Sequence, residues 1–341
     1  MKGLVYQGPK ELVWQDVSDV HAGEKEVRIK IKAVGICGSD VHGYLGLTGR
    51  RIAPMIMGHE FSGEVDQVGD GVTSVAVGDR VTAQPVQFCG TCEFCAQGLT
   101  NLCASPKKKF FGVLDCNGAM AEYLVVPERL LYKLPDTLGY EAGALAEAVA
   151  VAYRGVKRAG DLTGKHVLVI GAGTIGLLVL ALVKMRGAEK VYISDLSDGR
   201  LAVAQQMGAD VLLNPGTEDV LQRVKELTGG KGVDISLEAV GVTPSAKQSI
   251  ELLRTGGHAV WIGNSAKTVE IPMQDVVTRE LRIDGTFIYT HEEFGEAVEL
   301  LGSGAMHVEP MISLVADMQR GPELFAKLAD DPGDLIKVIL S

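Results

Sequence analysis

One stretch, residues 165–195, constrains the fold of this chain more than any other. It reads KHVLVIGAGTIGLLVLALVKMRGAEKVYISD. Residues 166–170 carry Val, Leu, Val and Ile in succession, which is typical of a strand buried on both faces of a parallel sheet. Three glycines follow in G-x-G-x-x-G spacing, then an apolar segment of helix length, then a second strand at 190–194 that leads into Asp195. The sequence therefore predicts a strand–turn–helix–strand unit.

Each part of this unit suits the binding of a dinucleotide. Gly171 permits a tight turn, Gly173 lets the backbone approach a pyrophosphate, and Gly176 lets the helix pack on the strand. The first turn of the helix, with Thr174 and Ile175, offers free N–H groups and the positive end of the helix dipole to the phosphates. The sequence therefore predicts a dinucleotide site at residues 171–176.

The acidic residue at the end of the second strand predicts which dinucleotide binds. Asp195 comes nineteen residues after Gly176, where a carboxylate accepts hydrogen bonds from ribose hydroxyls. It would also repel a 2′-phosphate, so NAD is predicted over NADP. Arg200 is the residue that would serve NADP instead. Residues 167–183 carry no charge, but the glycines interrupt them, and the remainder is shorter than the roughly 20 residues that a bilayer needs.

Composition excludes several classes of function. The 341 residues, 46% of them hydrophobic, suit two domains with cores of their own. A net charge of −10 without a long basic stripe argues against nucleic acid and anionic membranes as partners. The first residues contain no apolar export segment, so we expect a cytoplasmic protein. Its six cysteines are then expected to be thiols or metal ligands.

The rest of the chain divides around the dinucleotide unit. Residues 1–36 are predicted to form short strands, and residues 27–34 alternate apolar and polar side chains as a half-exposed strand does. After Asp195 helices and strands continue to alternate, with strands at 209–213, 233–237, 258–263 and 282–287 and helices at 197–207, 217–227 and 244–253. Six strands suit two mononucleotide-binding halves. The tail is predicted to carry a helix at 291–302 and a strand at 336–340.

A cluster of cysteines predicts a structural zinc site. Cys89, Cys92, Cys95 and Cys103 lie within fifteen residues, and four thiolates suit a closed tetrahedral zinc site. The alternative is four free thiols. A zinc ion there would stabilise a lobe, about residues 86–106, that has little apolar content of its own. The basic triplet 107–109 after it is predicted to be solvated, and Cys116 lies outside the cluster.

A second group of metal ligands is spread along the chain. Cys37 lies in CGSDVH and His59 in GHE, and each has a glycine beside it that permits a tight turn. Their separation means that the fold must bring them together. A catalytic zinc has about three protein ligands and one open position, so these residues are candidates for such a site.

The motifs together resemble one family. The pattern G-H-E-x2-G-x5-G-x2-V is matched by Gly58, His59, Glu60, Gly63, Gly69 and Val72. With the cysteine lobe and the glycine-rich turn in the same order, essentially the whole chain resembles the zinc-containing medium-chain dehydrogenase/reductase family, the alcohol dehydrogenase family. The resemblance implies an α/β protein: a Rossmann NAD-binding domain at 149–287, and a mainly β GroES-like catalytic domain formed by 1–148 and 288–341. It also implies a homo-oligomer, either dimer or tetramer.

The resemblance implies roles for the residues around the metal. Cys37 and His59 would ligate the catalytic zinc, and a carboxylate would complete the site. Glu60 and Glu147 are both candidates for that ligand. Zinc would lower the pKa of a bound hydroxyl, and the nicotinamide would take the hydride. Ser39 and His42 match the relay that carries the proton through a cofactor ribose to solvent. His291 and His307 are predicted to be ordinary tail residues.

Further residues are implied to contact the cofactor or the substrate. Cofactor contacts at strand ends would be Val240, Gly241, Ile262, Gly263 and Phe287. The carboxylate-type metal site, CGSDVH and the KFFG run resemble polyol dehydrogenases, so Tyr44 and Phe111 would line the pocket. One departure is Ile288, where sorbitol dehydrogenases commonly carry Arg.

The expected reaction is oxidation of a secondary hydroxyl on a polyol or polyol phosphate, with NAD and two zinc ions per chain. The alternatives are L-threonine 3-dehydrogenase and 2,3-butanediol dehydrogenase. From other classes, the alternatives are a zinc-free reductase and a non-catalytic NAD(P)-binding protein; the intact ligand set argues against both.

Overall fold

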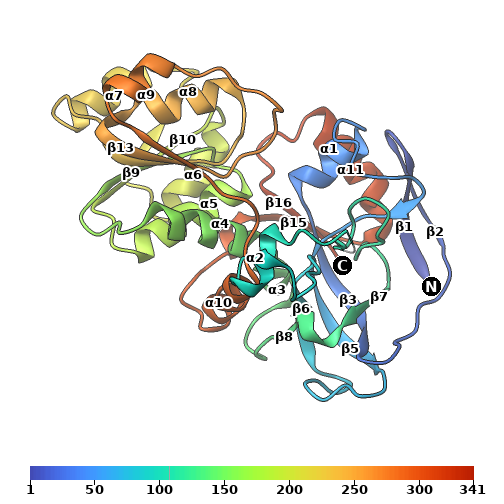
Figure 1. Ribbon diagram of the computed structural model, residues 1–341. Helices are drawn as coiled ribbons and strands as arrows, with labels where there is room; N and C mark the ends of the chain where they lie inside the picture. Colours follow the sequence, from blue (N-terminus) through green and yellow to red (C-terminus); the bar gives the residue numbers. More distant parts are fainter. Residues whose placement is uncertain (107) are drawn as a thin grey trace. The chain divides into compact units, whose positions relative to one another are not determined.

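The chain forms two compact units (Figure 1). The computed structural model describes residues 1–106 and 108–341, so Lys107 of the basic triplet lies outside it. The first unit comprises Met1–Glu147 and Thr290–Ser341, and the second comprises Ala148–Tyr289. The first unit is therefore discontinuous in sequence.

The second unit contains a six-stranded parallel sheet in the order β11-β10-β9-β12-β13-β14. Its strands are β9 (His166–Ile170), β10 (Lys190–Ser194), β11 (Val211–Leu213), β12 (Val233–Glu238), β13 (Leu253–Trp261) and β14 (Arg282–Gly285). The predicted strands of residues 166–170 and 190–194 are confirmed to the residue. Both lie near the centre of the sheet, where helices cover both faces and an apolar strand is stable.

One helix of this unit precedes its first strand, and the others connect successive strands. The helices are α4 (Ala146–Ala159, which begins in the first unit), α5 (Thr174–Met185), α6 (Asp198–Gln206), α7 (Val220–Leu227), α8 (Thr243–Glu251) and α9 (Met273–Thr278). α9 was not predicted, because a six-residue helix is too short to show a helical period. Residues 139–157 have apolar positions nearly all round a helix and so predict one buried helix, but the structure has two, α3 (Tyr140–Ala144) and α4, which separate at Leu145.

The first unit is mainly β, as predicted. Its larger sheet has seven strands, in the order β15-β16-β3-β5-β6-β8 with β7 also paired to β3, and its smaller sheet has the order β2-β1-β4. The strands are β1 (Lys2–Gly8), β2 (Glu11–Asp16), β3 (Glu26–Ile36), β4 (Met55–Ile56), β5 (Glu60–Val68), β6 (Arg80–Ala83), β7 (Tyr123–Pro127), β8 (Leu131–Lys133), β15 (Ile312–Ala316) and β16 (Lys337–Leu340). Besides α3, its helices are α1 (Gly38–Tyr44), α2 (Glu93–Ala96), α10 (His291–Gly302) and α11 (Gly321–Asp330), with 3₁₀ turns η1 (Thr100–Leu102), η2 (Glu128–Leu130), η3 (Glu309–Met311) and η4 (Met318–Arg320).

Strand β3 is the centre of this sheet. Along it Val27, Ile29 and Ile31 are buried in the core, which accounts for the alternation seen in the sequence. β3 pairs antiparallel with β5, β7 and β16. Because β16 comes from the end of the chain, the tail completes the sheet that carries the first half of the chain. Among the described residues, no helix combines the length and apolar character that crossing a membrane requires.

Candidate metal and cofactor sites

The paired ends of β3 and β5 bring three metal-ligating side chains together. Cys37 follows β3, His59 immediately precedes β5, and Glu60 is the first residue of β5. Gly35 pairs with Glu60 in this antiparallel ladder, so the end of one strand meets the beginning of the other. The ligating atoms of Cys37, His59 and Glu60 all lie within 4.8 Å of one another. A thiolate, an imidazole and a carboxylate at these distances fit a zinc ion.

Behind the imidazole lies a buried ion pair. Asp40 of α1 has one carboxylate oxygen 3.4 Å from His59 Nδ1 and 2.8 Å from Arg51 Nη2. Burial raises the pKa of Asp40, but in the metal-free protein the positive charges of a protonated His59 and of Arg51 outweigh it and hold that pKa well below its usual range. A carboxylate on one ring nitrogen orients the other toward a metal. The sequence reasoning did not single out Asp40 or Arg51.

The two candidate glutamates differ in position. Glu60 is 1% exposed, and its Oε2 accepts a hydrogen bond of 2.6 Å from Lys337 Nζ. Glu147 is also buried, but it lies outside the set of three ligands within 4.8 Å. The geometry therefore places Glu60, rather than Glu147, beside Cys37 and His59.

The other residues predicted near the metal have varied surroundings. Ser39 is exposed and His42 half-buried, and both lie on α1. Tyr44 is buried, with its hydroxyl donating to the Lys10 carbonyl at 3.1 Å. Phe111 is buried in the same core cluster as Tyr44. In this structure, therefore, both predicted pocket residues are core residues.

Another aromatic side chain contacts one of the candidate metal ligands. The rings of Phe110 and His59 meet edge to face, with centroids 5.4 Å apart. Phe110 is part of the same KFFG run as Phe111, so the run is relevant to the site although the sequence pointed to the other phenylalanine.

The four cysteines of the lobe converge as their spacing predicts. The Sγ atoms of Cys89, Cys92, Cys95 and Cys103 all lie within 4.8 Å of one another. Backbone N–H groups of Thr91 and Cys92 donate to Cys89 Sγ at 3.5 and 3.3 Å. These hydrogen bonds lower the pKa of Cys89 to about 6. A lowered thiol pKa favours the thiolate, which is the form that binds zinc.

Loss of one lobe thiolate should cost both metal and stability. We expect Cys92→Ser to contain about one zinc ion fewer per chain than the wild type and to melt several degrees lower, since structural zinc contributes folding free energy directly. Elemental analysis and thermal unfolding measure the two effects. Cys116→Ser is the matched control, because Cys116 is outside both metal-binding groups. A Cys92→Ser protein as stable and as zinc-rich as wild type would remove the structural site.

The glycine-rich turn in the second unit has the geometry that a phosphate site requires. Gly171 has a φ of 94°, a conformation that favours glycine. A Cβ on Gly176 would overlap the Gly171 carbonyl oxygen. α5 begins directly after Gly173, so its free N–H groups lie at this turn. The predicted phosphate cradle at 171–176 is consistent with these features.

Asp195 is tied to the same turn. Its Oδ2 accepts from the Ala172 N–H at 2.7 Å and its Oδ1 from the Ser197 N–H at 2.9 Å. These two bonds fix the carboxylate at the end of β10. The backbone N–H of Arg200 donates to Ser197 Oγ at 3.1 Å, in the first turn of α6.

The loops after β12 and β13 contain the other predicted cofactor contacts. A buried carboxylate shapes the first of these loops: Glu238 Oε1 accepts from the N–H groups of Val240 and Gly241 at 2.8 and 2.7 Å. A Cβ on Gly263 would crowd both Glu238 and Gly241, so Gly263 allows Ile262 and its neighbours to lie against the first loop. Phe287 is 45% exposed after β14. The sequence reasoning missed Glu238.

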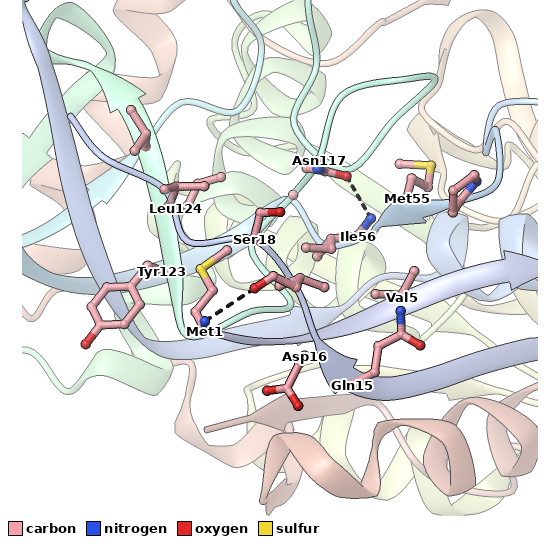
Figure 2. Close-up of a pocket in the computed structure, with 15 residues that line it drawn as sticks. Met1, Val5, Gln15, Asp16, Ser18, Met55, Ile56, Asn117, Tyr123 and Leu124 are labelled. Carbon is pink, nitrogen blue, oxygen red and sulfur yellow. Dashed lines mark hydrogen bonds between the residues drawn. The ribbon is translucent and has the colours of Figure 1, made fainter. Parts of the chain in front are cut away.

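A cavity of about 470 Å³ lies elsewhere in the first unit (Figure 2). Its rim includes Asn117, whose Oδ1 accepts from the Ile56 N–H at 3.0 Å. None of the predicted site residues is among its lining residues, which include Met1, Val5, Gln15, Met55 and Leu124. The cavity is therefore not where the candidate chemistry lies.

Comparison with known proteins decides the family. Residues 23–136 match the alcohol dehydrogenase GroES-like domain, and residues 174–303 match the zinc-binding dehydrogenase domain. A D-arabitol-phosphate dehydrogenase of Enterococcus avium is 35% identical over 346 residues, which cover 100% of this chain and 97% of the relative. This chain belongs to the zinc-containing medium-chain dehydrogenase/reductase family. It lies in the polyol dehydrogenase branch of that family, as its motifs predicted.

Two further comparisons support the assignment of this dehydrogenase. A D-xylulose reductase A of Aspergillus niger is 35% identical over 323 residues, 93% of this chain and 89% of the relative. The crystal structure of a zinc-binding dehydrogenase from Sinorhizobium meliloti bound to NADP superposes with a TM-score of 0.92, at 31% identity, covering 99% of this chain and 98% of that one. The predicted α/β fold, with its GroES-like and Rossmann parts, is confirmed.

Proposed function

We propose that this dehydrogenase oxidises a secondary hydroxyl of a polyol or polyol phosphate to a ketone, using zinc and NAD. The convergence of Cys37, His59 and Glu60 within 4.8 Å carries the proposal, because one thiolate, one imidazole and one carboxylate leave a zinc ion an open position. The names of the two relatives, which specify a polyol phosphate and a ketose, support the substrate class.

The residues around the site are suited to hold the metal and exclude water. When bound, zinc supplies a Lewis acid for the substrate hydroxyl, and the nicotinamide supplies the hydride acceptor. Cys37, His59 and Glu60 would hold the ion, and Asp40 would orient the imidazole. His59 and Glu60 are almost fully buried, so their electrostatic effects are screened less than at a surface. Phe110 covers one side of the imidazole.

The proton of the hydroxyl needs a path to solvent. Ser39 and His42 lie three residues apart on α1, and residues at this spacing share a helix face. Ser39 is exposed and His42 half-buried. His42 is the group that would accept the proton from Ser39 and pass it toward solvent.

Several finer features belong to the same proposal. The chain would hold two zinc ions, the catalytic one and a structural one in the lobe. The first unit would carry catalysis, with Glu147 near the metal, and the second would bind the dinucleotide through residues 171–176, Asp195 and the loops that contain Val240, Ile262 and Phe287. The family resemblance supports a cytoplasmic homo-oligomer.

Asp195 is the residue on which the preference for NAD would depend. We expect Asp195→Ala to lower the ratio of kcat/KM for NAD to that for NADP by roughly 10- to 100-fold, since a hydrogen bond to a charged group contributes about 1.5–3 kcal/mol. Asp198→Ala, which removes a carboxylate bonded to Asn214, is the control and should keep the wild-type ratio. An unchanged ratio in Asp195→Ala would exclude this role.

The substrate class is tested by NADH formation across a panel of alcohols. The panel contains free polyols, polyol phosphates, L-threonine, 2,3-butanediol and simple secondary alcohols. Highest kcat/KM on a polyol or polyol phosphate would support the proposal. Highest turnover on threonine or butanediol would keep the chemistry and reject the substrate class. No turnover of any member would favour the non-catalytic alternative.

A further inference from the structure

A buried lysine contacts one of the candidate zinc ligands. Lys337 Nζ donates to Glu60 Oε2 at 2.6 Å and to the Ile36 carbonyl at 3.3 Å. Both charged side chains of the pair are only 1% exposed. Lysine is almost never this buried unless it is paired. The 277 positions that separate the two residues in sequence show that the tertiary fold creates this contact.

The sheet is built so that the two side chains meet across the strand between them. β3 lies between β16 and β5, and Gly35 of β3 pairs with Ile339 on one side and Glu60 on the other. A Cβ on Gly35 would overlap the Glu60 carboxylate. The absence of a side chain at Gly35 therefore opens the space in which the carboxylate lies and the lysine reaches it.

The lysine contributes a positive charge to a site that contains several negative charges. Cys37 as a thiolate, Glu60 and Glu147 bring three negative charges into a buried region. The ammonium group of Lys337 lies 2.6 Å from Glu60 Oε2, beside these anions. One zinc ion and one lysine together balance the three anions. Without the lysine, a buried carboxylate would lack its partner, which is unfavourable.

We propose that Lys337 is a positioning residue that holds Glu60 Oε2, so that Glu60 ligates the catalytic zinc through one oxygen only and its second oxygen does not fill the open coordination position. This inference rests on the zinc site of the proposed function. Without Lys337, the carboxylate would turn its full charge toward the metal. The ion would then be bound more tightly and would be a weaker Lewis acid for the substrate.

The test compares Lys337→Met with Lys337→Arg, which keeps the charge. The release of zinc to a chromophoric chelator is followed in the purified proteins. The release phase that is absent from His59→Ala is assigned to the catalytic ion. We expect the rate of release of this ion from Lys337→Met to be roughly tenfold lower than from wild type, or lower still. The reason is that a carboxylate charge that no lysine offsets binds a divalent ion more strongly by at least this factor. Its kcat should fall while NADH affinity stays unchanged. Lys337→Arg should stay close to wild type.

A purely structural role for Lys337 predicts the opposite sign. If the lysine only supported the sheet, its loss would loosen the site and speed zinc release; equal or faster release from Lys337→Met would therefore overturn the inference. So would slow release from Lys337→Arg to the same extent as from Lys337→Met.

A double variant covers the case in which Lys337→Met folds poorly. Lys337→Met/Glu60→Gln removes both charges, so in chelated, zinc-free protein it should melt higher than Lys337→Met alone. Equal melting temperatures would mean that the two residues are not coupled, and would overturn the inference.

The melting temperatures are measured without zinc, so they also separate the inference about Lys337 from the proposed zinc site. If wild type lacks a zinc phase that depends on His59, the proposed zinc site fails, and the unfolding comparison still decides whether Lys337 acts through Glu60.

Discussion

His59→Ala is expected to abolish turnover while leaving the dinucleotide site intact. Its imidazole is one of three candidate ligands within 4.8 Å, and it contacts both the Asp40 carboxylate and the Phe110 ring. Loss of a Lewis acid that supplies several kcal/mol of transition-state stabilisation lowers kcat by about 10³-fold or more. The glycine-rich turn at 171–176 belongs to the other unit, so NADH should still bind.

Steady-state kinetics and a titration with NADH fluorescence measure the two halves of this prediction. His307→Ala is the control, because His307 is an exposed histidine outside the candidate metal-binding groups; it should keep wild-type kcat. A His59→Ala enzyme with kcat near that of wild type would show that the metal does not act at this site. Loss of NADH binding would show that the protein had been damaged more widely.

Asp40→Ala is expected to cause the largest loss of stability. It would leave Arg51, whose side chain is 3% exposed, as a buried charge without its carboxylate. Breaking a buried ion pair from one side costs about 3–5 kcal/mol. Urea unfolding at pH 7 measures the change in the free energy of unfolding. Asp16→Ala, which removes a carboxylate from an exposed pair with Lys2, should change little; an Asp40→Ala protein as stable as that control would contradict the account.

The same carboxylate predicts a pH dependence. The pKa of Asp40 is lower in the folded protein than in the unfolded chain, because the positive charges of His59 and Arg51 outweigh the opposing effect of burial. Its contribution to stability is therefore complete above the unfolded pKa, about 3.9, and is lost as the pH falls below that value. In chelated protein, the free energy of unfolding of the wild type should fall more steeply between pH 5 and pH 3 than that of Asp40→Asn. Parallel curves would contradict this origin of acid sensitivity.

Local patterns predicted the second unit better than the first. Strand, glycine turn, helix, strand and terminal acid all lie within residues 165–195, so hydrophobic periodicity and turn chemistry were sufficient for β9, α5 and β10. The break between α3 and α4 at Leu145 was missed, because apolar residues continue through it and a one-residue interruption does not disturb the pattern.

The grouping of the candidate metal ligands was also predictable, whereas the residues that contact them were not. Cys37, His59 and Glu60 lie in recognisable motifs, but Lys337 and Glu60 meet only through the pairing of β16, β3 and β5. One signal was present: Lys337 is a single charge in the predicted strand 336–340, which is otherwise apolar. A charge in such a strand indicates a buried partner.

His291 illustrates the same limit of local reasoning. It was predicted to be an ordinary tail residue, yet its N–H donates to Thr100 Oγ1 at 2.7 Å and its Nδ1 lies 2.7 Å from Gln84 Oε1. These contacts join α10 to the segment that carries the cysteine lobe. Nothing in the sequence near residue 291 shows them, because both partners are about 200 positions away.

The most direct test of the central claim is the zinc content of the purified wild type and of His59→Ala, measured together with their activity. If Cys37, His59 and Glu60 hold a catalytic zinc and the lobe holds a structural one, wild type contains two zinc ions per chain and His59→Ala contains one and is inactive. Chelation of the ion that His59→Ala lacks should remove activity from wild type, and added zinc should restore it. Full activity in a protein with zinc only in its cysteine lobe would contradict the account.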